Sequence, residues 1–237
     1  MSIIKKACIT NAKVKCMVWG AAGTEKSRFA LSFPKPLVID LERGTEWYAN
    51  QFNFYKSEID QSDEKAKNAS VLTKNVVDEL LTGKFADKIE TLVIDPITDL
   101  LDNVESILAN SYESTIRKKL TDLNALEKAK WYSHRRDRSR DVLNTIIQLP
   151  LNIVFVAREK NLWDSVKGQM KPVGKVFDGL ELIEYLPDLV IHLEKNGMNI
   201  TKSRIGKLPD FIEEKTFSAV QKALFKKYEP GKVIKAV

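Results

Sequence analysis

A short segment near the start of the sequence, "VWGAAGTEKSRF" at residues 18–29, contains residue types that bind phosphate groups. The phosphate-binding loop pattern G-x-x-x-x-G-K-[ST] needs a glycine, a lysine and a hydroxyl residue at fixed spacing, and Gly20, Lys26 and Ser27 meet it. In such a loop the backbone N–H groups surround the phosphates, the lysine neutralises the terminal phosphates and the hydroxyl holds Mg²⁺. The second glycine of the pattern is replaced by Glu25.

Glu25 changes the chemistry expected of this loop. A glycine there lets the backbone approach the phosphates in a conformation that is awkward for a side chain. The sequence leaves two interpretations open: the carboxylate pairs with Lys26 and competes with nucleotide, or it points to solvent at the start of a helix, where an acid is favourable. The candidate nucleotide-binding residues are Gly20, Ala21, Ala22, Gly23, Thr24, Glu25, Lys26, Ser27 and Arg28.

Two carboxylates end strand-like runs further along the chain. Asp95 closes "ETLVIDP", and Glu42 follows "PLVIDL". A strand-ending aspartate is the usual carboxylate near Mg²⁺ in phosphate-loop sites, and Glu42 could polarise the water that attacks the γ-phosphate. Each alone has a simpler explanation, because a strand-ending aspartate often only caps the next helix. The order of the loop, "VIDLE" and "VIDP" in successive strands predicts a nucleotide site.

The elements that position these residues alternate between strand and helix. Continuous apolar runs, typical of strands buried on both faces, occur at 15–20, 36–41, 91–96, 152–157 and 186–194, with a further strand at 199–204. Helical patterns separate them at 26–33, 71–82, 98–110, 124–149 and 213–228. This alternation predicts an α/β fold with a mostly parallel sheet and an antiparallel pair at one edge. Residues 51–70 are predicted to form a surface excursion.

The composition is that of a globular protein. Of the 237 residues, 43% are hydrophobic and 30% charged, and the net charge of +6 is compatible with a polyanionic partner. No apolar run reaches the roughly 18 residues needed to span a bilayer. Cys8 and Cys16 do not suggest a disulfide framework. We therefore expect a single domain in a reducing, intracellular location, with no membrane partner.

The segment "GAAGTEKSRFALSFPKPLVIDLERGTE" resembles the opening of the RecA-like P-loop ATPases of bacteriophages, nucleotide-binding proteins associated with single-strand annealing and recombination. The resemblance covers residues 14–205 and leaves 206–237 as a C-terminal helix and tail. It implies a RecA-like P-loop NTPase core that uses ATP and Mg²⁺ in the cytoplasm of a bacterial host. It also implies that Lys26 and Ser27 contact phosphate and metal, that Asp95 is the strand-end aspartate and that Glu42 activates water.

Two later segments extend the resemblance. "NIVFVAREKNLW" is similar to the strand that ends in a γ-phosphate-sensing residue, which implies this role for Arg158 or Lys160, although RecA proteins commonly have glutamine there. "NITKSRIGKLP" is similar to the segment whose basic residues reach the neighbouring subunit's nucleotide, here Lys202 and Arg204. Hydrolysis would then require a ring or filament of identical subunits. The alternative is that both cations are solvated on an edge strand.

By the same resemblance, the loop at 158–179 takes the place of a DNA-binding loop. Cations with an aromatic for stacking suit single-stranded DNA, and the candidates are Lys160, Trp163, Lys167, Lys171 and Lys175. The alternative is a lid over the nucleotide. The basic run at 134–141 is interpreted as a solvated, salt-bridged helix face, with Trp131 and Tyr132 packed against the sheet.

These observations favour an ATPase that acts on single-stranded DNA, with a single-strand DNA-binding protein as a further candidate partner. Two alternatives stay open. One is a non-hydrolysing DNA- or protein-binding module whose loop is weakened by Glu25. The other is a small-molecule phosphotransferase on the same scaffold.

Overall fold

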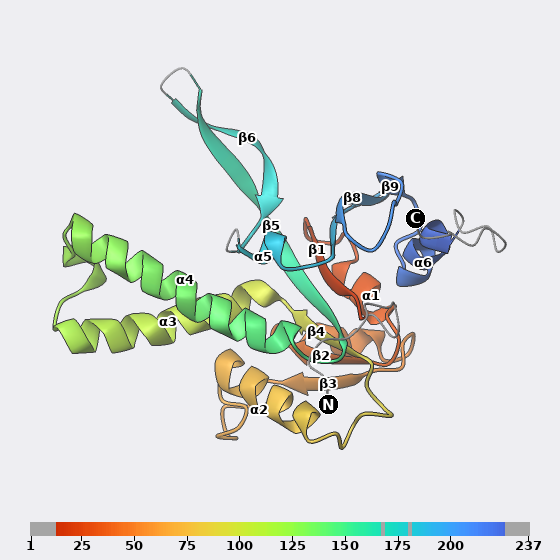
Figure 1. Ribbon diagram of the computed structural model, residues 1–237, viewed down its shortest axis with the longest axis horizontal. Coiled ribbons are helices and arrows are strands. Elements are labelled where there is room, and N and C mark those ends of the chain that lie inside the picture. Colours follow the sequence, from red (N-terminus) through yellow and green to blue (C-terminus); the bar gives the residue numbers. More distant parts are fainter. Residues whose placement is uncertain (1–12, 167–168, 180–181, 226–237) are drawn as a thin grey trace, which may run out of the picture.

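The computed structural model describes residues 13–166, 169–179 and 182–225 (Figure 1). The strands are β1 (Lys15–Gly20), β2 (Pro36–Asp40), β3 (Tyr55–Glu58), β4 (Thr91–Asp95), β5 (Asn152–Val166), β6 (Gln169–Phe177), β7 (Leu189–Glu194), β8 (Gly197–Ser203) and β9 (Phe211–Ile212). The helices are α1 (Lys26–Leu31), α2 (Ala69–Leu81), α3 (Ile97–Ile116), α4 (Ala125–Ile147), α5 (Leu182–Tyr185) and α6 (Phe217–Phe225). Two projections leave the body in Figure 1: the α3–α4 pair and the ribbon formed by β5 and β6.

The sheet has the strand order β3-β2-β4-β5-β1-β7-β8-β9, and β6 pairs with the outer part of β5. Strands β1 to β5 and β7 run parallel, whereas β8 and β9 add antiparallel pairs at one edge. Side chains alternate between two cores: Met17 and Trp19 face the core that contains α2, α3 and α4, and Cys16 and Val18 face the one that contains α1 and α6. Helices on both faces explain why the strand sequences are continuously apolar.

The expected strands at 15–20, 36–41 and 91–96 are present to within one residue. The description of 51–70 as only a surface excursion is wrong, because it contains β3, which pairs in parallel with β2 at the sheet edge. An edge strand meets less of the core, so the sequence "YKSE" carries no apolar signal there. Helix α3 also continues beyond the expected 98–110, to Ile116.

The expectation of a loop at 158–179 is wrong as well. Strand β5 continues past the apolar run and turns back as β6, which gives a two-stranded antiparallel ribbon with an irregularity between Leu162 and Trp163. The ribbon projects from the sheet in Figure 1. Its residues are mostly exposed, so no continuous apolar run marks it in the sequence.

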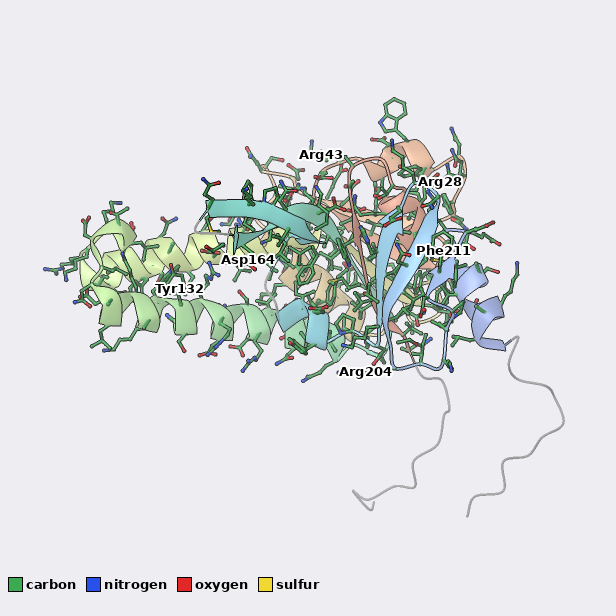
Figure 2. The ribbon with its side chains drawn as sticks, turned by 90° about the horizontal axis from the view of Figure 1, so that it is seen from above. Arg28, Arg43, Tyr132, Asp164, Arg204 and Phe211 are labelled. Atoms are coloured by element: carbon green, nitrogen blue, oxygen red, sulfur yellow. The ribbon has the colours of Figure 1, made fainter. Side chains whose placement is uncertain are left out.

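Helix α4 packs along α3 rather than on the sheet at Trp131 and Tyr132. The Trp131 ring lies 5.3 Å from the ring of Tyr112 on α3, whereas Tyr132 is exposed (Figure 2). The expectation that both pack against the sheet is therefore wrong. Arg135 pairs with Glu105 of α3 at 2.9 Å, as a salt-bridged helix face requires. None of the helices in the described part of the chain is long and apolar enough to cross a membrane.

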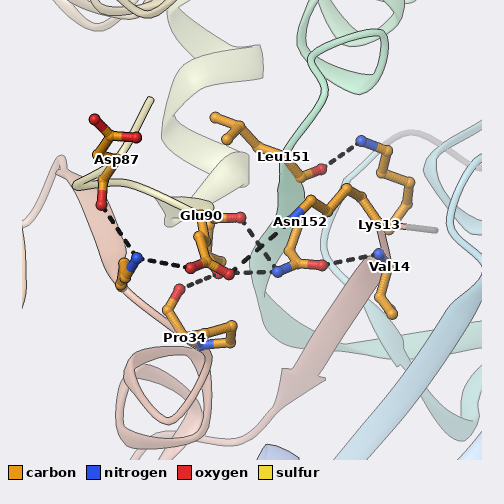
Figure 3. A network of polar contacts seen from close by, with 10 residues as sticks. Lys13, Val14, Pro34, Asp87, Glu90, Leu151 and Asn152 are labelled. Atoms are coloured by element: carbon orange, nitrogen blue, oxygen red, sulfur yellow. Dashed lines mark hydrogen bonds and ion pairs between the residues drawn. The ribbon is translucent and has the colours of Figure 1, made fainter. Parts of the chain in front are cut away.

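A polar network at the amino ends of three strands fixes their register (Figure 3). The side chain of Asn152 on β5 accepts a hydrogen bond from Val14 N at 3.0 Å and donates to Glu90 O at 3.2 Å and to Thr91 Oγ1 at 3.3 Å. Asn152 is buried, so these bonds satisfy groups that water cannot reach. The network joins β1, β5 and β4 at the edge opposite the loop at Gly20.

Candidate nucleotide-binding site

The loop between β1 and α1 begins at Gly20, where a side chain has no room. A Cβ atom on Gly20 would lie 2.3 Å from the carbonyl oxygen of Leu193, at the end of β7, so glycine is required there. Thr24 Oγ1 donates to Ala21 O at 2.9 Å and closes the turn. Gly23 takes a φ of 76°. The loop therefore sits at the carboxyl end of β1, where α/β folds bind ligands.

Lys26 folds back over this loop. Its Nζ donates to Ala21 O at 2.8 Å. Burial lowers the pKa of Lys26, and the carboxylates of Asp95 and Glu42 oppose that shift. Phosphate oxygens are stronger acceptors for an ammonium group than a neutral carbonyl. The Nζ is thus available to exchange the Ala21 carbonyl for a phosphate.

Glu25 adopts a left-handed backbone conformation, with φ 71° and ψ 29°. A glycine enters this region freely and a glutamate does so at a cost. The carboxylate does not pair with Lys26, and it does not point only to solvent. It lies 2.7 Å from Lys215 Nζ and 3.6 Å from Arg28 Nη1. The hydrogen bond from Lys215 lowers the pKa of Glu25. Both interpretations of Glu25 drawn from the sequence omitted this lysine.

Ser27 and Asp95 meet where β4 ends and α1 begins. Ser27 Oγ donates to Asp95 Oδ2 at 2.6 Å. Asp95 is only 6% exposed, and burial raises its pKa to about 6. The sequence predicted this pair as the metal-binding residues, and the structure brings the two side chains together.

The donor set fits Mg²⁺. This ion takes oxygen ligands and is usually held by one or two carboxylates together with substrate phosphates and water. A hydroxyl and a carboxylate in contact match that pattern. In the described residues there is no group of three or more His, Cys, Asp or Glu side chains able to hold a metal ion, so a dedicated protein cage is not formed there.

Asp40, which the sequence analysis did not select, organises the turn that carries Glu42. Its carboxylate accepts hydrogen bonds from Thr45 N at 2.8 Å, Thr45 Oγ1 at 2.6 Å and Gly44 N at 3.2 Å. Asp40 is opposite Asp95 in the β2–β4 register. Its side chain is therefore used to fix the turn after β2.

Glu42 is held by Arg158. The guanidinium donates from Nε to Glu42 Oε1 at 3.2 Å and lies 2.7 Å from Asp99 Oδ1, in the first turn of α3. One cation thus bridges the carboxylate expected to activate water and a second acid that the sequence analysis missed. Arg158, one of the two sensing candidates, lies in this site, whereas Lys160 pairs with Asp178 at 3.1 Å.

A second polar cluster lies one residue further along β5. Glu159 Oε2 is 3.1 Å from His192 Nε2, and its other oxygen is 3.3 Å from Lys175 Nζ. The His192 ring stacks on Trp19, with ring centroids 3.8 Å apart. Pairing of β1 with both β5 and β7 assembles this cluster. Sequence alone gave no signal for it, because its members come from separate strands.

Four of the five candidate DNA-binding residues lie on the ribbon, namely Lys160, Trp163, Lys171 and Lys175. Trp163 is 53% exposed, and Lys171 is opposite Asp164 in the β5–β6 register. Lys160 and Lys175 each pair with an acid, as described above. Lys167 lies outside the described residues.

Lys202 and Arg204 do not reach the loop of their own chain. Lys202 Nζ donates to the carbonyl oxygens of Glu184 at 2.7 Å and Tyr185 at 3.0 Å, and Arg204 donates to Tyr185 O at 3.1 Å. Because β8 runs antiparallel to β7, both residues lie toward the amino ends of the parallel strands. Figure 2 shows Arg204 well apart from Arg28.

The mostly parallel sheet, the helices on both faces, the antiparallel edge strands and the loop after β1 together define a P-loop NTPase core, which confirms the predicted fold class. Residues 12–222 match the model of a family described as an AAA domain, and the chain belongs to this family. No curated protein matches the chain. Among solved structures, a KaiC-like protein from the hyperthermophilic archaeon Pyrococcus horikoshii OT3 is similar at 13% identity, over 81% of this chain and 80% of that one, with a TM-score of 0.39.

Proposed function

We propose that the chain is a RecA-like ATPase that hydrolyses ATP with Mg²⁺ at the loop between β1 and α1. The observation that carries this proposal is the 2.6 Å hydrogen bond from Ser27 Oγ to Asp95 Oδ2, which joins the start of α1 to the end of β4. The negative charges of Asp95 and Glu42 both raise the pKa of Lys26, against the lowering by burial. The groups needed for phosphoryl transfer therefore gather at one edge of the sheet.

Each residue has a role that its position supports. The loop N–H groups and Lys26 bind phosphate oxygens. Ser27 and Asp95 would hold Mg²⁺, which would neutralise the charge that develops on the transferred group. Glu42 accepts a proton from the attacking water, once Arg158 has turned away from it. The terminal phosphate would offer Arg158 an anionic partner in exchange, and Arg158 would then act as its sensor.

The Arg158–Glu42 ion pair also supports a second candidate function. If the pair persists with nucleotide bound, Glu42 stays neutralised and no water is activated. The chain would then bind nucleotide without hydrolysing it, and would act as a binding module on the same fold.

Single-stranded DNA is the partner that we propose for the ribbon. Leu162, Trp163, Met170 and Val173 are exposed there, and bases stack on exposed aromatic groups whatever their sequence. Lys160 and Lys175 pair with Asp178 and Glu159 in the free protein. DNA phosphates would replace these carboxylates as partners of the two lysines. The ribbon starts directly after Arg158, with the Glu159–Phe177 pair, so the base of the ribbon lies beside the nucleotide site.

Assembly into a ring or filament is the remaining part of the proposal. Lys202 and Arg204 are tethered beside Tyr185, which is 68% exposed. In an assembly of identical subunits, this edge would meet the nucleotide of a neighbour and supply the cations that stabilise the transferring phosphoryl group. We propose that this assembly acts in recombination or annealing in a bacterial host cytoplasm, together with a single-strand DNA-binding protein.

The test is ATP hydrolysis and binding, measured with and without a single-stranded oligonucleotide. We expect hydrolysis by the wild type, increased by the oligonucleotide. The Glu42→Gln variant should bind MgATP as the wild type does and hydrolyse it about 100-fold or more slowly, the usual contribution of a positioned base. The Trp163→Ala variant should keep basal hydrolysis and lose the stimulation.

Three results would contradict parts of this proposal. Unchanged turnover in Glu42→Gln would remove the assigned base. Binding of MgATP without turnover by the wild type would favour the non-hydrolysing module. Stimulation that survives Trp163→Ala would move the DNA site away from the ribbon.

A further inference from the structure

Lys215, which lies just before α6, is the main partner of the glutamate in the loop. Its Nζ is 2.7 Å from Glu25 Oε2. Its side chain is only 15% exposed, whereas the 3.6 Å contact from Arg28 comes from a side chain that is 45% exposed. Water screens the more exposed contact more strongly, so Lys215 dominates the charge environment of Glu25.

The ammonium group of Lys215 is fixed by further acceptors. It donates to the carbonyl oxygens of Glu194 at 3.3 Å and Lys195 at 3.1 Å, in the turn between β7 and β8. The same end of β7 provides the Leu193 carbonyl that lies against Gly20. Lys215 therefore has a defined position relative to the first residue of the loop.

The chain around Lys215 also holds the other end of α1. Phe217 N donates to Ser32 Oγ at 2.8 Å, and the rings of Phe33 and Phe217 stack with centroids 3.8 Å apart. Both ends of the short helix that follows the loop are thus joined to residues 215–217. This arrangement fixes the position of Lys215 relative to α1.

We propose that Lys215 is a positioning residue that holds the Glu25 carboxylate away from the phosphate site, and so permits a glutamate where the loop pattern requires glycine. This inference rests on the proposed function, because it concerns how the same loop binds MgATP. Without Lys215, the carboxylate is free to approach Lys26 and the phosphates. The carboxylate and the phosphates are both negative, so their repulsion opposes binding of MgATP. The loss of affinity measures this repulsion.

The experiment compares MgATP dissociation constants by calorimetry for the wild type, Glu25→Gln, Lys215→Met and the double variant. We expect Lys215→Met to weaken binding about tenfold or more, which corresponds to roughly 1.4 kcal/mol. Glu25→Gln should bind MgATP at least as tightly as the wild type, because it removes the charge that needs a partner. The double variant should return to the affinity of Glu25→Gln.

Two further variants separate positioning from folding. Lys222→Met makes the same charge change at an exposed site on α6 and should leave binding unchanged. Glu25→Asp shortens the acid and so lengthens its 2.7 Å contact with Lys215, while Lys215 keeps its carbonyl contacts. It should weaken binding in the same direction as Lys215→Met, and it provides the test if Lys215→Met fails to fold.

Each other outcome overturns the inference in a recognisable way. A double variant as weak as Lys215→Met would mean that Lys215 acts only by holding the β7–β8 turn. Binding by Glu25→Gln but not by the wild type would mean that Lys215 does not neutralise the glutamate, while the loop assignment stands. No binding by any variant would remove the proposed function and this inference together.

Discussion

Single backbone positions around the loop carry strict steric demands. Gly20 lies against a carbonyl of β7, and a Cβ there would sit 2.3 Å from that oxygen. Glu25 takes a left-handed φ of 71° without being glycine. A side chain at Gly20 would clash with backbone, and no change of rotamer relieves such a clash. The unfavourable φ of Glu25 can instead be offset by a stabilising contact such as that with Lys215.

Gly20→Ala tests the steric demand at the start of the loop. The added methyl group must displace the end of β7 or the loop itself, so we expect a loss of about 1–3 kcal/mol in the free energy of unfolding. Chemical denaturation followed by circular dichroism measures it. Gly44→Ala is the matched control, because a Cβ at Gly44 has nothing within 4 Å and φ there is −95°. Equal stability of both variants would contradict the steric argument.

The sheet is stabilised by buried hydrogen bonds of the Asn152 side chain as well as by its apolar faces. The side chain of Asn152 contacts the amino ends of β1 and β4 together in the network of Figure 3. Its amide provides both an acceptor and a donor. An isosteric carboxylate or an apolar residue cannot do both.

Asn152→Leu should lower the free energy of unfolding by about 1–3 kcal/mol, because Val14 N and Thr91 Oγ1 lose a buried partner. Thermal and denaturant unfolding measure this loss. Asn161→Leu, on the exposed ribbon part of the same strand, is the control and should change stability little. A neutral Asn152→Leu would show that the network does not stabilise the sheet.

The strands that could be predicted are those buried on both faces, such as β1 and β4. Their sequences are continuously apolar because helices cover both faces of the sheet there. The polar edge strand β3 and the ribbon part of β5 could not be found in this way, because solvent contact removes the apolar signal. Likewise, Lys26, Ser27 and Asp95 follow from a local pattern and a strand end.

Other contacts of the site need the folded chain. Lys215 meets Glu25, and Asp99 meets Arg158, only because strands and helices distant in sequence are brought together. No spacing rule connects them. The sequence therefore identified the loop but not the charges that surround it.

For the whole molecule, the loop and the Lys202–Arg204 edge lie at different ends of the sheet strands. One chain cannot unite them; in the proposed assembly, a neighbouring subunit would. Under the proposed assembly, the Glu42→Gln and Lys202→Ala variants are each inactive, and mixing them regenerates sites with both wild-type residues.

We expect ATP hydrolysis in the mixture to recover to about a quarter of the wild-type rate, the share of interfaces with both residues intact after random mixing. Steady-state hydrolysis measures this recovery. A mixture of Glu42→Gln with Glu42→Gln,Lys202→Ala is the control and should stay inactive. No recovery in the first mixture would contradict a site shared between subunits.

Strand β5 runs without a break from Asn152, in the middle of the sheet, past Arg158 and out into the ribbon. Arg158 is the last residue of this strand in register with β1, and the next residue, Glu159, is the first that pairs with β6. The cation that holds Glu42 therefore lies at the junction between the sheet and the ribbon. A ligand on the ribbon and a nucleotide at the phosphate loop would both act on this junction, and any coupling between them would be equal in both directions.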